Sequence, residues 1–480
     1  MMREAKQDMS YHLFISNRSR QALIAAVLLA LFLSPSYSSP DSSPARAGGN
    51  GSTLVSTETR EGRLAVFDDV WATINERYYD AQFHGVDWET QKTNFRGLAA
   101  EAGTSRELYV VLKRMIASLG DSHTRIYPPE EKFDWWRPRF VTIGVTLKEI
   151  EGRAVVGQVQ KGSAAQRGGL RAGDLIESIN GQSATALVKS KLANASASGL
   201  LSTSATTSRF RAFASLLDGP AGSSVEIRWL GKNGKERTAH FRRDWQQREL
   251  ELRTRRESGY VVIEIDAFTK PIAAAFTRAL KEKVSGVRGV ILDLRSNGGG
   301  DTEAMTDMAS AVVGAGSSLG QFTERSRFSF TLFTRSKSAL TPERIAATNL
   351  PMVVLTSERT ASAAEIFVAA MKASGRASVI GAETCGCVLA IRTRHALPDG
   401  GLLDVSELDY RTAAGIRLEG RGVKPDEFVQ IERSDLYSGR DRALERAINK
   451  MKTRMMTLAP TFETGGADLA NSIILFSVSA

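Results

Sequence analysis

Apolar residues between positions 59 and 135 recur every three or four positions, which is the spacing of one face of an α-helix. Two such faces contain Leu64, Val66, Phe67, Val70, Trp71 and Ile74, and Leu108, Val111, Leu112, Met115 and Ile116. Asp87 is placed to cap a further helix that starts at Trp88, and Ser105 precedes the last helix. Gly120 suits the position that follows a helix end. The pattern predicts a helical N-terminal domain.

The pattern changes to short alternating segments with glycine turns between positions 139 and 243. Strands are predicted at residues 143–147, 154–156, 174–179 and 225–229. Asn180-Gly181 is a strong signal for a tight turn, and Ser163 opens a short helix. The stretch 183–217 is long and polar, and we interpret it as an insertion into this β domain.

From position 258 to 433, continuous apolar runs alternate with helical segments, as in α/β proteins whose parallel strands are buried on both faces. The strands are predicted at residues 260–265, 289–294, 352–355 and 379–381, and the helices at 272–284, after Asp301 and at 363–372. Sites are expected at the carboxyl ends of such strands. Residues 314–350 break the alternation and are interpreted as an insertion or lid. A last helix is predicted at 441–456.

The first residues have the pattern of an export signal. Arg18 and Arg20 precede an apolar run of 12 residues, 22–33, whereas a membrane span needs about 20. Ala45-Arg46-Ala47 has the small residues of a cleavage site, and residues 34–57 have the Ser, Pro and Gly content of a linker. We therefore expect an exported protein, periplasmic or secreted, which an uncleaved leader would keep at the membrane.

Composition narrows the function classes. Of the 480 residues, 42% are hydrophobic and 24% charged, as in ordinary globular proteins, and the net charge is +10. No basic run is interleaved with aromatic residues, so nucleic-acid binding has no support, whereas a basic surface suits association with an anionic envelope. Two cysteines and five histidines are too few for a disulfide framework or an obvious metal site. The spacing of Cys385 and Cys387 disfavours a bond between them.

Two strand-to-helix turns carry candidate chemistry. Ser362 stands where a buried strand leads into a helix, a place that suits helix capping or, with N–H groups facing a developing oxyanion, nucleophilic attack. Residues 293–300, "DLRSNGGG", end a neighbouring strand with three glycines, which let backbone N–H groups approach a ligand. Taken separately, each turn has an ordinary structural explanation. Together they supply a nucleophile and oxyanion donors for acyl transfer.

Several blocks resemble those of the C-terminal processing (tail-specific) peptidase family, and they occur in the family's order. They read "LGDSHT", "DLRSNGGG", "TASAAEIF", "GAETCGC" and "EGRGVKPDEFV", and "VVGQVQKGSAAQRGGLRAGDLIESINGQ" resembles a PDZ domain. The resemblance implies a multidomain α+β protein with a helical N-terminal domain, a PDZ-like β domain and an α/β, crotonase-like (ClpP/crotonase) protease core. The domains expected are 1–47 leader, 48–58 linker, 59–135 helical, 139–243 PDZ with the insertion 183–217, 244–433 core, and 434–480 C-terminal helix and tail.

Residue roles follow from the same resemblance. Ser362 is the nucleophile, and the N–H groups of Ala363 and Gly299 form the oxyanion hole. In the PDZ domain, the peptide-binding residues are Ile143, Gly144 and Val145, along a groove that takes an extended C-terminus as an added strand. No cofactor and no metal ion is implied.

The base departs from the commoner pattern of the family. Many members pair serine with a lysine, and Cys387 stands at the lysine position, where a thiol cannot accept the serine proton unaided. Another branch, similar to the tricorn protease, uses serine, histidine and glutamate, and His123 and Glu419 fill those positions. His395 is the rival base, and Lys372 would point away from the turn.

We therefore expect an exported serine endopeptidase that cleaves polypeptides near exposed C-termini through an acyl-enzyme, using Ser362, His123 and Glu419. The alternative is a catalytically inactive pseudoprotease whose PDZ domain makes it a binding or scaffold protein. A third class, a small-molecule acyl enzyme on a crotonase-like core, fits less well because a small substrate needs no peptide groove.

Overall fold

A computed structural model describes residues 54–131, 134, 137–197, 205–335 and 350–458. The predicted leader, residues 1–47, lies outside these ranges, as do most of the predicted linker and the end of the predicted tail. Within the described ranges, no helix combines the length and the apolar character needed to cross a membrane.

The N-terminal segment folds into the predicted helices, α2 (Arg60–Arg77), α3 (Trp88–Glu101) and α4 (Ser105–Ala117). Asp87 caps α3 by accepting from the Thr90 N–H, as expected. The cap of α4 is Thr104, because its side chain accepts from the Glu107 N–H, so the prediction that Ser105 precedes the helix was one residue off. The apolar faces of these helices form one core, which Leu397, Leu403 and Val405 from the far end of the chain complete.

Residues 139–247 form an antiparallel β unit. Its six-stranded sheet contains β3 (Val145–Ile150), β4 (Arg153–Val159), β5 (Leu175–Ile179), β6 (Gln182–Ser183), β7 (Ser224–Leu230) and β8 (Glu236–Arg242), while β2 (Arg139–Thr142) pairs with β9 (Asp244–Gln247). The strand predicted at 143–147 is wrong at its start. Gly144 has φ +91° and a Cβ there would lie 2.1 Å from the Ser163 Cβ, so the chain turns there and β3 begins one residue later.

The described part of the stretch 183–217 is mostly helical, in α6 (Ala184–Ala197) and α7 (Ala205–Ala214), with a short 3-10 turn after α7. Apolar side chains from these helices, among them Val188 and Phe213, are buried with Trp229 in the core of the β unit. Much of the polar composition of this stretch is on exposed helix faces, whereas Thr207 of α7 is buried.

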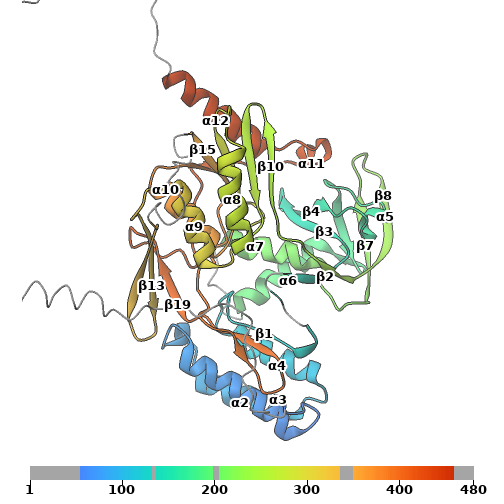
Figure 1. The fold of residues 1–480 in the computed structure, drawn as a ribbon. Helices are drawn as coiled ribbons and strands as arrows, with labels where there is room; N and C mark the ends of the chain where they lie inside the picture. The colour runs from blue at the N-terminus through green and yellow to red at the C-terminus, as the bar shows by residue number, and fades with distance from the viewer. Residues whose placement is uncertain (1–53, 132–133, 135–136, 198–204, 336–349, 459–480) are drawn as a thin grey trace, which may run out of the picture. The chain divides into compact units, whose positions relative to one another are not determined.

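The core of the chain is the predicted α/β layer (Figure 1). Its sheet runs in the order β10 (Leu252–Glu257), β11 (Tyr260–Ile265), β12 (Val290–Asp293), β15 (Met352–Thr356), β16 (Ser378–Gly381) and β20 (Glu427–Phe428). All pairs are parallel except β10 with β11. The antiparallel edge strand β10 was not predicted, because its residues are mostly exposed and charged.

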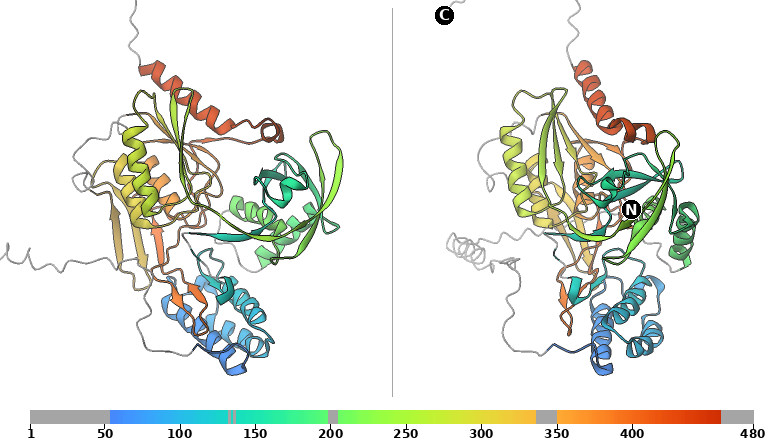
Figure 2. Two further views of the ribbon diagram at one scale, coloured as in Figure 1. Left: turned by 45° about the vertical axis from the view of Figure 1, so that its right-hand side comes forward. Right: turned by 90° about the vertical axis from the view of Figure 1, so that its right-hand side faces the viewer.

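Helices cover both faces of this sheet. One face is packed against α8 (Lys270–Glu282), α9 (Thr302–Val312) and α10 (Ala363–Ala373), and the other against α12 (Arg442–Leu458), which follows the short α11 (Arg433–Ser438). Figure 2 shows α8 and α12 apart on either side of the strands. Burial on both faces explains why the strands are continuous apolar runs in the sequence.

The stretch 314–350 was interpreted as an insertion or lid, and its described part is instead a β-hairpin. Strands β13 (Ser318–Glu324) and β14 (Ser329–Phe333) pair with each other, and β13 also pairs with β19 (Leu408–Arg411). Leu319 and Phe322 of this hairpin are buried in the same core as α8 and α10. The hairpin therefore extends the folded core.

Candidate active site

Ser362 lies at the turn between β15 and α10, in a strained backbone conformation. Its φ is +56° and its ψ −126°, a region that residues with a side chain seldom occupy and that clusters at functional sites. Its N–H donates to the Cys387 carbonyl at 2.8 Å, and the N–H of Ala361 donates to the Asn297 carbonyl at 3.1 Å. The turn of Ser362 is therefore held by the turns that follow β12 and β16.

The glycine turn after β12 lies directly against Ser362. Gly299 has φ +104°, and a Cβ on it would lie 2.8 Å from the Ser362 Cβ and 3.2 Å from the Ala363 nitrogen. Only a glycine fits there. Ala363 is the first residue of α10, where an N–H has no acceptor within the helix. The Gly299 N–H donates to Asn297 Oδ1 at 2.9 Å in this structure, so the two predicted oxyanion donors differ in what they bind.

Glu365, in the first turn of α10, holds the Ser362 turn through hydrogen bonds. The sequence analysis did not single it out. Its carboxylate is buried and accepts four hydrogen bonds. The donors are Thr384 Oγ1 (2.5 Å) and the Gly386 N–H (2.7 Å) on Oε1, and the N–H groups of Cys387 (2.9 Å) and Ser362 (3.2 Å) on Oε2. Burial raises the pKa of Glu365 to about 7 against the effect of these donors. The signal that could have found it is the Ser-x-x-Glu spacing of a capping box.

Cys385 and Cys387 form a disulfide, which the sequence analysis disfavoured. Gly386 between them has φ +69°, so the chain folds back and the two Cα atoms lie 5.2 Å apart, within the usual range for a disulfide. The prediction failed because spacing alone does not show how sharply a glycine lets the chain turn. Both side chains are buried.

Glu419 lies on the other side of the same turn. Its Oε2 accepts from the N–H groups of Val388 (2.5 Å) and Leu389 (3.2 Å), whereas its Oε1 is buried and has no hydrogen-bond partner among the described residues. Burial raises the pKa of Glu419 to about 8. A buried polar atom without a partner is rare in folded proteins, so Glu419 differs from Glu365 in having one oxygen outside the hydrogen bonds that the described residues make.

His123 lies in the turn that follows α4. Asp121 Oδ1 accepts from the His123 N–H (2.7 Å) and from Ser406 Oγ (2.9 Å), and the His123 Nδ1 lies 3.1 Å from Ser122 Oγ. Burial lowers the pKa of His123 to about 4, so the ring is neutral near pH 7. Among the residues that the structure describes, no hydrogen bond joins His123 to Ser362 or to Glu419.

The rival bases have other partners. His395 Nε2 lies 2.7 Å from Asp69 Oδ2 of α2, and Lys372 Nζ donates to the Lys424 carbonyl and pairs with Asp426. No group of three or more His, Cys, Asp or Glu side chains within the described ranges is arranged to hold a metal ion.

Three segments of the chain match known domain families. Residues 259–429 match peptidase family S41, residues 60–117 match the tricorn protease C1 domain, and residues 155–195 match the PDZ domain. The chain therefore contains a domain of peptidase family S41, at residues 259–429. It is a serine-type peptidase with a PDZ domain.

Relatives of this S41 peptidase include C-terminal processing enzymes. It is 25% identical over 386 residues to the chloroplastic carboxyl-terminal-processing peptidase 1 of Arabidopsis thaliana, covering 77% of this chain and 71% of the relative. It is 27% identical over 298 residues to a probable CtpA-like serine protease of Staphylococcus aureus, covering 60% of this chain and 52% of that protein, about half its length. The fold is similar to that of mature CPAF, with a TM-score of 0.61 at 11% identity over 84% of this chain and 99% of the other.

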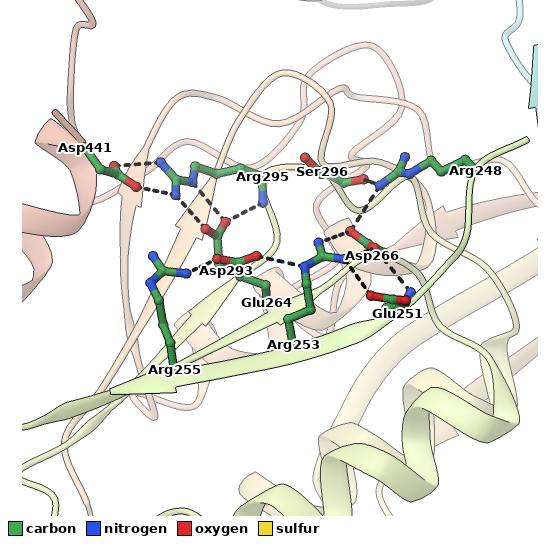
Figure 3. Close-up of polar contacts among 10 residues, drawn as sticks. All are labelled: Arg248, Glu251, Arg253, Arg255, Glu264, Asp266, Asp293, Arg295, Ser296 and Asp441. Atoms are coloured by element: carbon green, nitrogen blue, oxygen red, sulfur yellow. Dashed lines mark hydrogen bonds and ion pairs between the residues drawn. The ribbon is translucent and has the colours of Figure 1, made fainter. Parts of the chain in front are cut away.

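A polar cluster holds the glycine turn of the peptidase in place (Figure 3). The Arg295 guanidinium lies between two carboxylates and donates to Asp293 at 2.6 Å and to Asp441 at 2.7 and 2.8 Å. Ser357 Oγ, from the Ser362 turn, donates to the Arg295 carbonyl at 2.7 Å. Arg248 Nη2 donates at 3.2 Å to the Ser296 carbonyl, one residue further along. These contacts fix the position of the glycines relative to Ser362.

In the PDZ domain, the three predicted peptide-binding residues lie together at the start of β3. The Ile143 carbonyl accepts from the Ala165 N–H (3.1 Å) of α5 (Ala164–Arg167), and the side chain of Ile143 is buried. Gly144 and Val145 follow it into the strand, where Val145 pairs with Val159. The edge of β3 therefore begins beside the N-terminal turn of α5.

Proposed function

We propose that the chain is an exported serine endopeptidase that cleaves polypeptides near their C-termini, with Ser362 as nucleophile, His123 as base and Glu419 as the carboxylate that supports the base. The single observation that carries the proposal is the packing of Gly299 and the Ala363 N–H against a strained Ser362, at the carboxyl ends of two parallel strands. The similarity to the carboxyl-terminal-processing peptidase of Arabidopsis thaliana supports the choice of the substrate's C-terminal end.

In the proposed reaction, the neutral His123 takes the proton of Ser362 as its Oγ attacks the scissile carbonyl. The developing oxyanion accepts from the Ala363 N–H and from the Gly299 N–H, and the Gly299 N–H gives up its bond to Asn297 Oδ1 to do so. The Glu419 carboxylate stabilises the imidazolium, which then protonates the leaving amine. Water hydrolyses the acyl-enzyme. Because His123 has no hydrogen bond to Ser362 here, the turn of residues 121–124 has to approach Ser362 when substrate binds.

The PDZ domain has a supporting role in the proposal. The substrate's C-terminus adds as a strand beside Val145, and the backbone at Ile143 and Gly144 receives its carboxylate. The core is proposed to have the crotonase-like arrangement. The predicted export signal and the net charge of +10 support the proposal of action outside the cytoplasm, near an anionic envelope.

The test is cleavage of an unfolded polypeptide tail by Ser362→Ala and by Ser374→Ala, a matched control at the other end of α10 whose Oγ donates only to helix carbonyls, those of Ala370 and Met371. We expect Ser362→Ala to lose at least about a thousandfold in kcat/KM and Ser374→Ala to keep its rate. Labelling of the wild type by a fluorophosphonate should disappear in Ser362→Ala only. Unchanged turnover of Ser362→Ala would reject the assignment.

A further inference from the structure

The Cys385–Cys387 disulfide lies in direct contact with the backbone of the proposed nucleophile. The Cys387 carbonyl accepts the Ser362 N–H at 2.8 Å, and the Cys387 N–H donates to the same Glu365 oxygen that Ser362 uses. Both cysteines are buried. A change of oxidation state at these sulfurs therefore occurs beside the reacting serine.

The backbone of this turn is held by bonds that do not depend on the disulfide. The Cys385 N–H donates to the Thr360 carbonyl (2.9 Å), the Gly386 N–H to Glu365 Oε1 (2.7 Å), and the Gly420 N–H to the Gly386 carbonyl (2.9 Å). Reduction would therefore leave the turn folded and change mainly the chemistry of the two sulfur atoms.

The guanidinium of Arg211, on a helix of the PDZ domain, contacts both sulfur atoms. Arg211 of α7 places Nη2 3.1 Å from Cys387 Sγ and 3.7 Å from Cys385 Sγ, and one turn earlier Thr207 Oγ1 donates to the Cys385 carbonyl at 2.6 Å. The carboxylates that act on the charge of Arg211 are Glu419, Asp121 and Glu365, and its charge acts on His123 in turn. The guanidinium thus stands among the groups of the proposed site.

We propose that Cys385 and Cys387 form a thiol–disulfide exchange site that regulates the peptidase, with the oxidised enzyme the more active form. A dithiol reduces it: the protein S–S bond breaks and an S–S bond forms in the reductant, while one of its two protons passes to Cys385 Sγ and the other to solvent, which leaves Cys387 as a thiolate. The inference rests on Ser362 as the proposed nucleophile.

The charge of Arg211 explains why the oxidised enzyme should be the more active form. Against a disulfide, which is neutral, the guanidinium has only a weak acceptor and can leave with α7 when substrate enters. A cation beside a cysteine stabilises its thiolate, so the reduced Cys387 becomes an ionic partner for Arg211. A charge-assisted hydrogen bond is about twice as strong as a neutral one, and it would hold Arg211 and α7 on the site.

The experiment compares the full chain after air oxidation and after dithiothreitol. Alkylation and intact mass should show no free thiol before reduction and two after it, and kcat/KM on an unfolded tail should fall about tenfold on reduction and return on reoxidation. Equal rates in the two states, or a rate that rises on reduction, would overturn the proposal, as would free thiols in the oxidised protein.

Two variants separate this inference from the proposed function. Arg211→Gln should make reduced and oxidised enzyme equally active, whereas Arg209→Gln, on the same helix but paired with Glu149, should keep the tenfold response. Cys385→Ser/Cys387→Ser should not respond to dithiothreitol. A response to dithiothreitol that persists in Arg211→Gln or in the double variant would overturn the redox proposal. Persistence of cleavage in Ser362→Ala would instead overturn the proposed function.

Discussion

Two buried glutamates lie on either side of the turn of residues 384–389, and they use their oxygens differently. Glu365 has both oxygens occupied by four donors, whereas Glu419 has two donors on Oε2 and none on Oε1. Burial raises the pKa of both carboxyl groups. Two glutamates that are both buried can therefore differ in role. Glu365 uses both oxygens to hold the backbone around Ser362, whereas Oε1 of Glu419 makes no hydrogen bond to the described residues.

The largest loss of stability is expected for Glu365→Gln. An amide has one acceptor oxygen, so at least one pair of donors to the carboxylate would face an NH2 group instead. Each buried donor left unsatisfied costs about 1–3 kcal/mol, so we expect the free energy of unfolding to fall by about 3 kcal/mol in urea titrations. Glu303→Gln, in the first turn of α9, is the matched control and should change it by less than about 0.5 kcal/mol. Equal stability of the two variants would remove the distinction between the glutamates.

Glu419→Gln should keep its stability and lose activity. Its amide oxygen can accept from Val388 and Leu389 while its NH2 group takes the position of Oε1, which loses no partner. The urea midpoint should therefore stay or rise. Loss of the negative charge beside the imidazolium should lower kcat/KM about a hundredfold, or about 2.7 kcal/mol. A variant that is both stable and fully active would show that Glu419 has no part in the reaction.

The pH dependence sharpens the same contrast. With a pKa of about 8, Glu419 is mostly protonated at about pH 7 and mostly ionised at about pH 9, so kcat/KM should rise about tenfold over that interval if the carboxylate is the active form. Stability should move the other way. A raised carboxyl pKa contributes stability that is complete below the unfolded value, near 4.5, and that is lost as pH rises through about 8.

Rate and denaturation profiles of the wild type and Glu419→Gln check this prediction. The variant should lack the rise in rate, and its stability relative to the wild type should increase with pH. A rate step of unchanged size in Glu419→Gln would assign the titration to another group, of which Glu365, with a pKa of about 7, is the first candidate.

Much of the fold could be predicted because its signals are local. The helices of residues 60–117 and the buried strands of the core have strong periodicity, and the pattern led to Ser362 and to the glycine turn of residues 293–300 because each follows a strand end. The backbone of Gly299 does lie against Ser362. These residues are brought together by the register of parallel strands, which the sequence pattern indicates well.

The rest depended on features that no local pattern carries. The disulfide requires the left-handed turn at Gly386, the strand predicted at 143–147 is interrupted because Gly144 packs on Ser163, and residues 318–333 form strands only because β19 provides their partner. Three of the four bonds of Glu365 reach residues 19 to 22 positions away, so a capping-box signal shows only the fourth, to Ser362. Such contacts are set by tertiary packing.

The smallest effect on kcat is expected at the turn of His123, whose residues Asp121 and Thr124 are bonded to Ser406. Ser406 Oγ donates to Asp121 Oδ1 at 2.9 Å and accepts from Thr124 Oγ1 at 3.2 Å, which ties this turn to the chain near β18 (Leu402–Asp404). Ser406→Ala removes these two side-chain bonds and keeps the bond from the Ser406 N–H to Thr124 Oγ1 (3.1 Å), so we expect about 1 kcal/mol less stability and about a threefold lower kcat with KM unchanged.

The control for this variant is Ser438→Ala, whose Oγ bonds only within α11. It should leave kcat and KM as they are. Ser406 makes none of the hydrogen bonds around Glu365, so the substitution should leave the Ser362 turn unchanged. If His123 activates Ser362, the rate at which a fluorophosphonate labels Ser362 should fall in Ser406→Ala together with kcat. If kcat falls while the labelling rate stays constant, the base that activates Ser362 is not His123, and the two turns are not coupled in the reaction.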